Sequence, residues 1–151
     1  METKIEQFKI IGISIRTTNE NNKAIGDIAN LWNRFLSEKI IEKIPNEVSS
    51  EIYAVYTDYE GDYTKPYTTI LGCKVENLYQ IPKGMVGKEF AGGKYHQLIA
   101  KGNITKGAVV QEWIKILNSD LDRAYTTDFE VYGEKAHNPE NAEVEIFVAI
   151  Q

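Results

Sequence analysis

A strict alternation of apolar and non-apolar residues occupies the last quarter of the chain. It runs over residues 128–133 and again over residues 143–150. A period of two is typical of strands with one buried face. We therefore predict that two β-strands end the chain and that a polar hairpin loop over residues 134–141 joins them.

The side chains of these two strands are expected to divide between two faces, because neighbours on a strand point in opposite directions. Glu130 and Tyr132 then share one face of the first strand, and Glu145 and Phe147 share one face of the second. Large aromatic rings are unusual on a solvated face, so we interpret these side chains together as one wall of a concave site. A carboxylate among rings suits an organic cation.

The rest of the chain repeats one order of elements twice: strand, helix, strand, strand. The expected strands span residues 8–16, 51–57, 67–75, 86–90 and 94–100, and the expected helices span residues 24–41 and 107–117. Two βαββ modules in tandem, about 7–80 and 84–151, predict an α+β fold with a pseudo-twofold axis. In this fold antiparallel sheets form a central ligand groove and the helices lie on the other face. Because no linker separates the modules, we expect residues 1–151 to be a single domain.

Composition restricts the class of protein. The net charge of −5 and the scattered lysines argue against a nucleic-acid surface, which needs clustered basic residues. No segment approaches the roughly 20 apolar residues of a membrane span, and the first residues do not resemble a signal peptide. We therefore expect a cytoplasmic protein with no direct contact to nucleic acid or membrane.

Metal and cofactor sites are not expected. The single cysteine, Cys73, lies in an apolar strand, and His96 and His137 are far apart in sequence with no further ligands at metal-binding spacing. The chain also has no phosphate-binding loop, dinucleotide fingerprint or nucleophile elbow. We therefore predict no metal and no cofactor.

Several short motifs resemble those of one known family. They are the glycine turn 91–95, the helix with Trp113, the run 125–132 and the terminal strand 144–150. Their order and spacing are similar to the GyrI-like small-molecule-binding family, which is also the effector-binding domain of some AraC-type and MerR-type transcription regulators. The resemblance covers residues 8–150.

The resemblance implies roles for individual residues. Glu130 corresponds to a groove carboxylate that pairs with cationic, often aromatic, ligands, and Tyr132 would share its wall. Trp113, Tyr53 and Phe147 would complete the pocket. The chain has Phe147 and Ala149 where the family often has tyrosine and proline, so one hydroxyl donor is missing there.

Alternatives remain open at this point. Glu130 and Glu145 are equally compatible with solvent-facing strand positions, and Trp113 with ordinary core packing. The favoured function is a stand-alone sensor, sequestering protein or transcription effector for small hydrophobic cations. A second is a hydrolase of strained cyclopropane-type electrophiles, in which Glu130 activates water and Tyr132 or Tyr53 supplies a proton. A third is a gyrase-inhibitor-like module that binds a protein partner.

Overall fold

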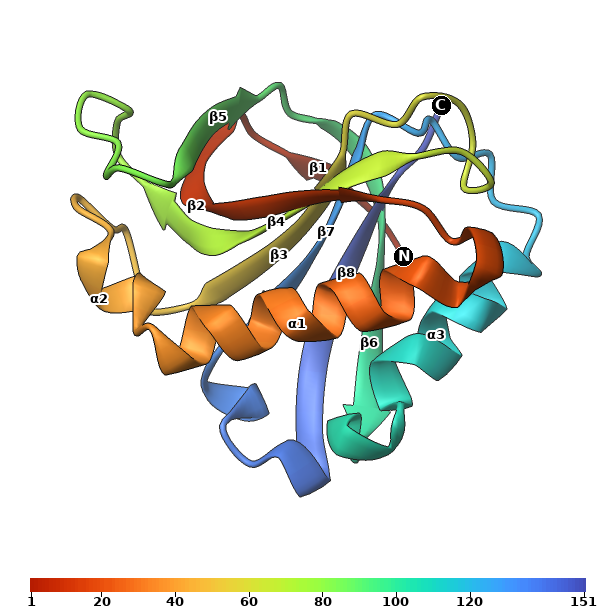
Figure 1. Ribbon diagram of the computed structural model, residues 1–151. Coiled ribbons are helices and arrows are strands. Elements are labelled where there is room, and N and C mark those ends of the chain that lie inside the picture. Colours follow the sequence, from red (N-terminus) through yellow and green to blue (C-terminus); the bar gives the residue numbers. More distant parts are fainter.

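The computed structural model describes residues 1–151 and contains one antiparallel sheet of eight strands, curled into a half-barrel (Figure 1). The strands are β1 (Glu2–Ile5), β2 (Phe8–Thr17), β3 (Ile52–Thr57), β4 (Tyr67–Val75), β5 (Val86–Phe90), β6 (Gly93–Gly102), β7 (Thr127–Tyr132) and β8 (Ala142–Ala149). Their order in the sheet is β1-β6-β8-β7-β3-β4-β2-β5. The predicted α+β class and the antiparallel sheet are confirmed.

Three α-helices and four short 3-10 turns complete the chain. The helices are α1 (Lys23–Ser37), α2 (Ile40–Lys43) and α3 (Ala108–Leu117), and the turns are η1 (Glu20–Asn22), η2 (Ile104–Lys106), η3 (Glu134–Ala136) and η4 (Pro139–Asn141). The predicted first helix is divided because Lys39 adopts a left-handed conformation with φ of 50° between α1 and α2. No helix combines the length and the apolar character needed to cross a bilayer.

Helices α1 and α3 both pack on one face of the sheet, with α1 crossing in front of it in Figure 1. Leu31 and Phe35 of α1 are buried against β2, β3 and β4. Ile116 of α3 is buried against β6 and β8. These side chains recur at helical spacing, so each helix hides one apolar stripe and leaves the opposite side to solvent.

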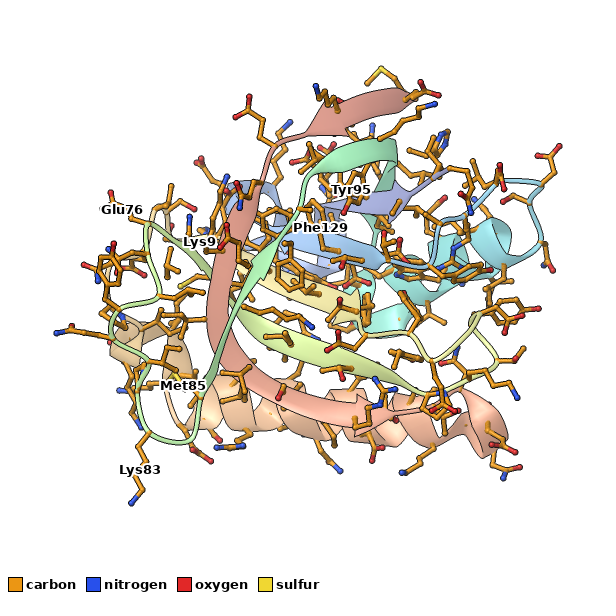
Figure 2. The ribbon with its side chains drawn as sticks, turned by 90° about the horizontal axis from the view of Figure 1, so that it is seen from above. Lys9, Glu76, Lys83, Met85, Tyr95 and Phe129 are labelled. Atoms are coloured by element: carbon orange, nitrogen blue, oxygen red, sulfur yellow. The ribbon has the colours of Figure 1, made fainter.

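The other face of the sheet is concave and has its own apolar cluster. Figure 2 shows Phe129 and Tyr95 inside the curl of the sheet. The buried members of this cluster are Phe8, Ile10, Val55, Ile70, Phe90, Tyr95, Phe129, Val131, Phe147 and Ala149. The sheet therefore separates two apolar layers, one beneath the helices and one inside the curl.

The turn between β5 and β6 closes the curl. Gly92 in this turn lies against the backbone that joins β1 to β2, and a Cβ at this position would collide with the carbonyl oxygen of Ile5. Only glycine allows such a close approach of two backbones. The two outer strands, β1 and β5, are consequently held near each other by the connections of the chain.

Candidate functional site

The register of β7 and β8 decides which predicted site residues lie together. Phe129 is directly opposite Phe147, and Glu130 is opposite Ile146. Directly opposite residues of an antiparallel pair point to the same face, so Glu130 and Phe147 point to opposite faces. Our expectation of one shared wall is wrong, because the long connection between these strands does not fix their register as a tight turn does.

Helices α1 and α3 lie on the same face of the sheet as Glu130, whereas we expected them on the opposite face. Glu130 and Tyr132 point toward α1 and α3, and Tyr132 packs against the apolar layers beneath both helices. The prediction that the helices would lie on the far face from the ligand groove is therefore wrong for Glu130. Trp113, Glu130 and Tyr132 are brought together on the helix-covered face.

Glu130 is completely buried, with 1% of its surface exposed, and it accepts three hydrogen bonds. The Tyr132 hydroxyl donates to Oε1 over 2.6 Å. The Trp113 Nε1–H and the Tyr56 hydroxyl donate to Oε2 over 2.6 Å and 3.0 Å. One carboxylate is thus held by side chains from β7, α3 and β3.

Aromatic rings surround this carboxylate. Tyr56 makes edge contacts with Trp113, at 5.6 Å between ring centroids, and with Tyr67, at 6.1 Å. On the other side, Tyr132 makes an edge contact with Trp32 of α1 at 4.9 Å. Both tryptophans are half-buried, so the rings of the two helices lie between Glu130 and solvent. Tyr56 and Trp32 were not among the residues predicted for this site.

The electrostatic state of Glu130 follows from its burial. Burial raises the pKa of Glu130, whereas the hydrogen bonds from Tyr132, Trp113 and Tyr56 lower it. No basic side chain is close enough to contribute. Burial, followed by the charge of Glu130, raises the pKa values of Tyr56 and Tyr132 well above the usual range, so both hydroxyls keep their protons. The site is a buried carboxylate with neutral donors and no counter-charge.

A second buried carboxylate, on the same strand and face, has a different environment. Asp128 accepts hydrogen bonds from Arg123 Nη2 at 2.9 Å, the Tyr59 hydroxyl at 2.6 Å and the Ala149 amide at 2.8 Å. The Arg123 guanidinium lies 4.4 Å over the Tyr125 ring. Asp128 therefore has its cation within the protein, unlike Glu130. Asp128 lies two residues before Glu130, and this spacing already predicts that both carboxylates share one face of the strand.

The remaining predicted residues, Tyr53, Glu145 and Phe147, lie together on the concave face. They line a cavity of about 330 Å³ that opens inside the curl of the sheet. Phe147 itself is buried, with 8% of its surface exposed. The six predicted residues thus form two groups of three, separated by the sheet.

Comparison with known proteins identifies a family. Residues 3–150 match the family of the integron-associated effector-binding protein named Cass2. A crystallised integron cassette protein from the mobile metagenome of Vibrio cholerae is 31% identical, with a TM-score of 0.76 over 100% of this chain and 95% of that one. Among curated proteins, YobU of Bacillus subtilis (strain 168), a candidate transcriptional regulator, is 26% identical over 99% of this chain and 96% of its own length.

More distant solved structures share the fold. SAV2435, solved with bound tetraphenylphosphonium, has a TM-score of 0.82 at 19% identity, over 100% of this chain and 93% of that one. A structure of EcmrR in complex with DNA and a hydrolase of Listeria innocua align at TM-scores of 0.62 and 0.50, with 10% and 9% identity. At these identities the likeness extends to the fold alone.

Proposed function

Because the chain belongs to the integron-associated effector-binding family, we propose that it binds hydrophobic organic cations on the helix-covered face of the sheet, with Glu130 as their counter-charge. The observation that carries this proposal is the complete burial of Glu130 among neutral donors. The bound tetraphenylphosphonium in SAV2435, a protein of the same fold, supports the choice of ligand class. In this role the chain acts as a sensor, a sequestering protein or the effector part of a transcription regulator.

The physical argument rests on a missing charge. A buried carboxylate is costly without a positive partner, because burial disfavours its ionised form. A cation bound near Glu130 relieves this cost, and the surrounding rings add cation–π attraction of about 0.5–2 kcal/mol. Three hydrogen bonds already orient the carboxylate, so the ligand needs no hydrogen-bond donor of its own. The site therefore favours cations whose charge is enclosed by apolar groups.

Exposed apolar side chains on both helices lie on the same stripes as the two tryptophans that cover the site. Ile25 and Leu36 lie on the same helical stripe of α1 as Trp32 and are 67% and 61% exposed. On α3, Val110 and Leu117 lie on the stripe of Trp113 and are 56% and 37% exposed. Exposed apolar residues grouped in this way are typical of ligand-binding grooves. A hydrophobic cation gains contact with them before it reaches the carboxylate.

Thermal-shift measurements with tetraphenylphosphonium test the proposal. A ligand that binds only the folded chain raises its melting temperature by mass action. We expect this rise in the wild type and its loss in Glu130→Gln, which keeps the shape of the side chain and removes the charge. The matched control is Glu145→Gln, which removes a carboxylate from the opposite face and is expected to retain the full shift.

The same pair of variants separates the alternatives. An equal shift in the wild type and in Glu130→Gln would contradict the proposal. Binding that is retained in Glu130→Gln together with lost turnover of a cyclopropane-type electrophile would favour the hydrolase. If no cation shifts the wild type, a protein partner becomes the leading hypothesis.

A further inference from the structure

The cavity inside the curl of the sheet has the composition of a second ligand site. We propose that it binds aromatic compounds that carry a protonated amine, independently of the cation site at Glu130. The cavity has a volume of about 330 Å³ and lies on the concave face, with the full thickness of the sheet between it and the helices. It can therefore be occupied whether or not the first site is filled.

The floor of the cavity is a row of aromatic rings. Tyr53 stacks on Phe129 with 5.9 Å between ring centroids and 24° between planes. Phe129 stacks on Phe147 at 4.7 Å and 16°. The three rings come from β3, β7 and β8, so their nearly parallel orientation is fixed by strand pairing. Because these rings stack on one another, they present their edges to the cavity, and the face of a planar ligand ring can pack on those edges.

Two glycines lie in the strands next to Tyr53. Gly72 on β4 is directly opposite Tyr53, and Gly12 on β2 is directly opposite Gly72. Neither contributes a side chain to the concave face. The backbones also approach so closely here that a Cβ at Gly72 would collide with the Ile11 carbonyl oxygen. Glycine at both positions therefore allows β2 and β4 to approach each other closely beside Tyr53.

Two carboxylates of the cavity, Glu51 and Glu145, act electrostatically on Tyr53. Burial, then the charges of Glu51 and Glu145, raise the pKa of Tyr53 to about 12. Glu145 lies in the same cross-strand row as Tyr53, with Val131 between them. The Tyr53 hydroxyl has no hydrogen-bond partner within the chain, although half-buried. The region above the floor is therefore negative and holds an unused donor and acceptor.

These rim carboxylates have free acceptor capacity. Glu145 accepts one hydrogen bond, from Gln97 at 2.6 Å, and Glu51 accepts one, from Ser49 at 3.3 Å. Neither forms a salt bridge. An ionised carboxylate can accept about four hydrogen bonds. An ammonium group has three donors, so it can bind Glu51 or Glu145 while the aromatic part of the same ligand contacts the ring edges in the cavity.

The overall charge of the rim favours the same ligand. Three carboxylates, of Glu6, Glu51 and Glu145, oppose two lysines, Lys4 and Lys74. The two sites differ chemically: Glu130 already accepts three hydrogen bonds from neutral donors, whereas Glu51 and Glu145 accept one each and can take donors from the ligand. Primary amines are therefore expected at the concave cavity, and cations that lack N–H groups at Glu130.

Calorimetric titration with tryptamine tests the proposal, because this probe combines a planar ring with a primary ammonium group. We expect binding to the wild type that becomes about ten- to a hundredfold weaker in Glu145→Gln, since one charge-assisted hydrogen bond is lost. Glu51→Gln is expected to weaken it similarly. Glu140→Gln, which removes an exposed charge in η4, and Glu130→Gln are the controls and should bind as the wild type does.

A competition experiment on the wild type needs no variant. Saturating tetraphenylphosphonium should leave tryptamine binding unchanged, because the two ligands occupy different faces. Three results would each overturn the proposal. The wild type does not bind tryptamine, tetraphenylphosphonium displaces it, or Glu130→Gln loses tryptamine binding while Glu145→Gln retains it. Tetraphenylphosphonium binding to Glu145→Gln reports separately on the first site, so failure of one site is distinguished from failure of the other.

Discussion

Acidification should weaken cation binding at Glu130, because protonation removes the negative charge of this buried carboxyl. Burial raises the pKa of this carboxyl, so it takes up a proton at a pH above the ordinary glutamate value of 4.5. Once protonated, it no longer attracts the ligand. The affinity should then fall about tenfold for each pH unit below the raised pKa, because binding the cation requires release of that proton.

At low pH the affinity should reach a lower plateau, and Coulomb's law gives the difference in affinity between the ionised and the protonated site. Two unit charges about 4–6 Å apart attract by about 3–4 kcal/mol at an effective dielectric constant near 20, a value that fits buried groups in proteins. This energy corresponds to a loss of about 100- to 1,000-fold in affinity. Ring and apolar contacts remain after protonation and account for the residual binding.

Isothermal titration calorimetry with tetraphenylphosphonium between pH 8 and pH 4.5 measures this curve, since the charge of this ligand does not titrate. Glu130→Gln should show the weak plateau affinity at every pH. Circular dichroism at each pH confirms that the chain remains folded. A wild-type affinity that does not change over this range, or an equal slope in Glu130→Gln, would refute the assignment of Glu130 as the counter-charge.

Three further predictions concern stability without ligand. Burial raises the folded-state pKa of Glu130, so its ionisation lowers the stability of the fold as the pH rises from about 4.5 through the raised value. At pH 8 the melting temperature of Glu130→Gln should therefore equal or exceed that of the wild type. At pH 4.5 the difference between the two should be smaller. Trp113→Phe removes the 2.6 Å donor to this carboxylate and should lower the free energy of unfolding by about 1–3 kcal/mol in urea titrations; an unchanged midpoint would contradict the bond. Arg123→Met leaves Asp128 buried without its cation and should cost about 3–5 kcal/mol by the same assay, whereas a loss below about 1 kcal/mol would show that the pair is not coupled.

Much of the secondary structure could be predicted from the sequence. The strands Tyr67–Val75 and Val86–Phe90 have the predicted bounds, and α3 begins one residue later than predicted and ends where expected. In these segments local preference and hydrophobic period agree with the final packing. Strand β1 was missed because it is short, half-charged and paired only along one edge with β6, so no period was visible.

The site was predicted only in part, for a reason that lies in strand register. Alternation in β7 and β8 correctly separated Glu130 from Phe129 on their own strand. It could not tell which face of β8 lies beside Glu130, because a shift by one residue exchanges the two faces. Pairing of Phe129 with Phe147 settled this question. Tyr56, on a strand distant in sequence, depended on the β3–β7 pairing and was equally invisible.

The positions of the two tryptophans allow ligand binding at the helix-covered site to be followed by intrinsic fluorescence. The chain has only Trp32 and Trp113, and both belong to the ring group around Glu130. The aromatic side chains of the concave cavity are phenylalanine and tyrosine. Intrinsic tryptophan fluorescence, excited at the red edge of indole absorption, is therefore a reporter of one face of the sheet. Without any label, quenching or a spectral shift caused by a ligand that is not itself an indole reports occupancy beneath the helices and not inside the curl.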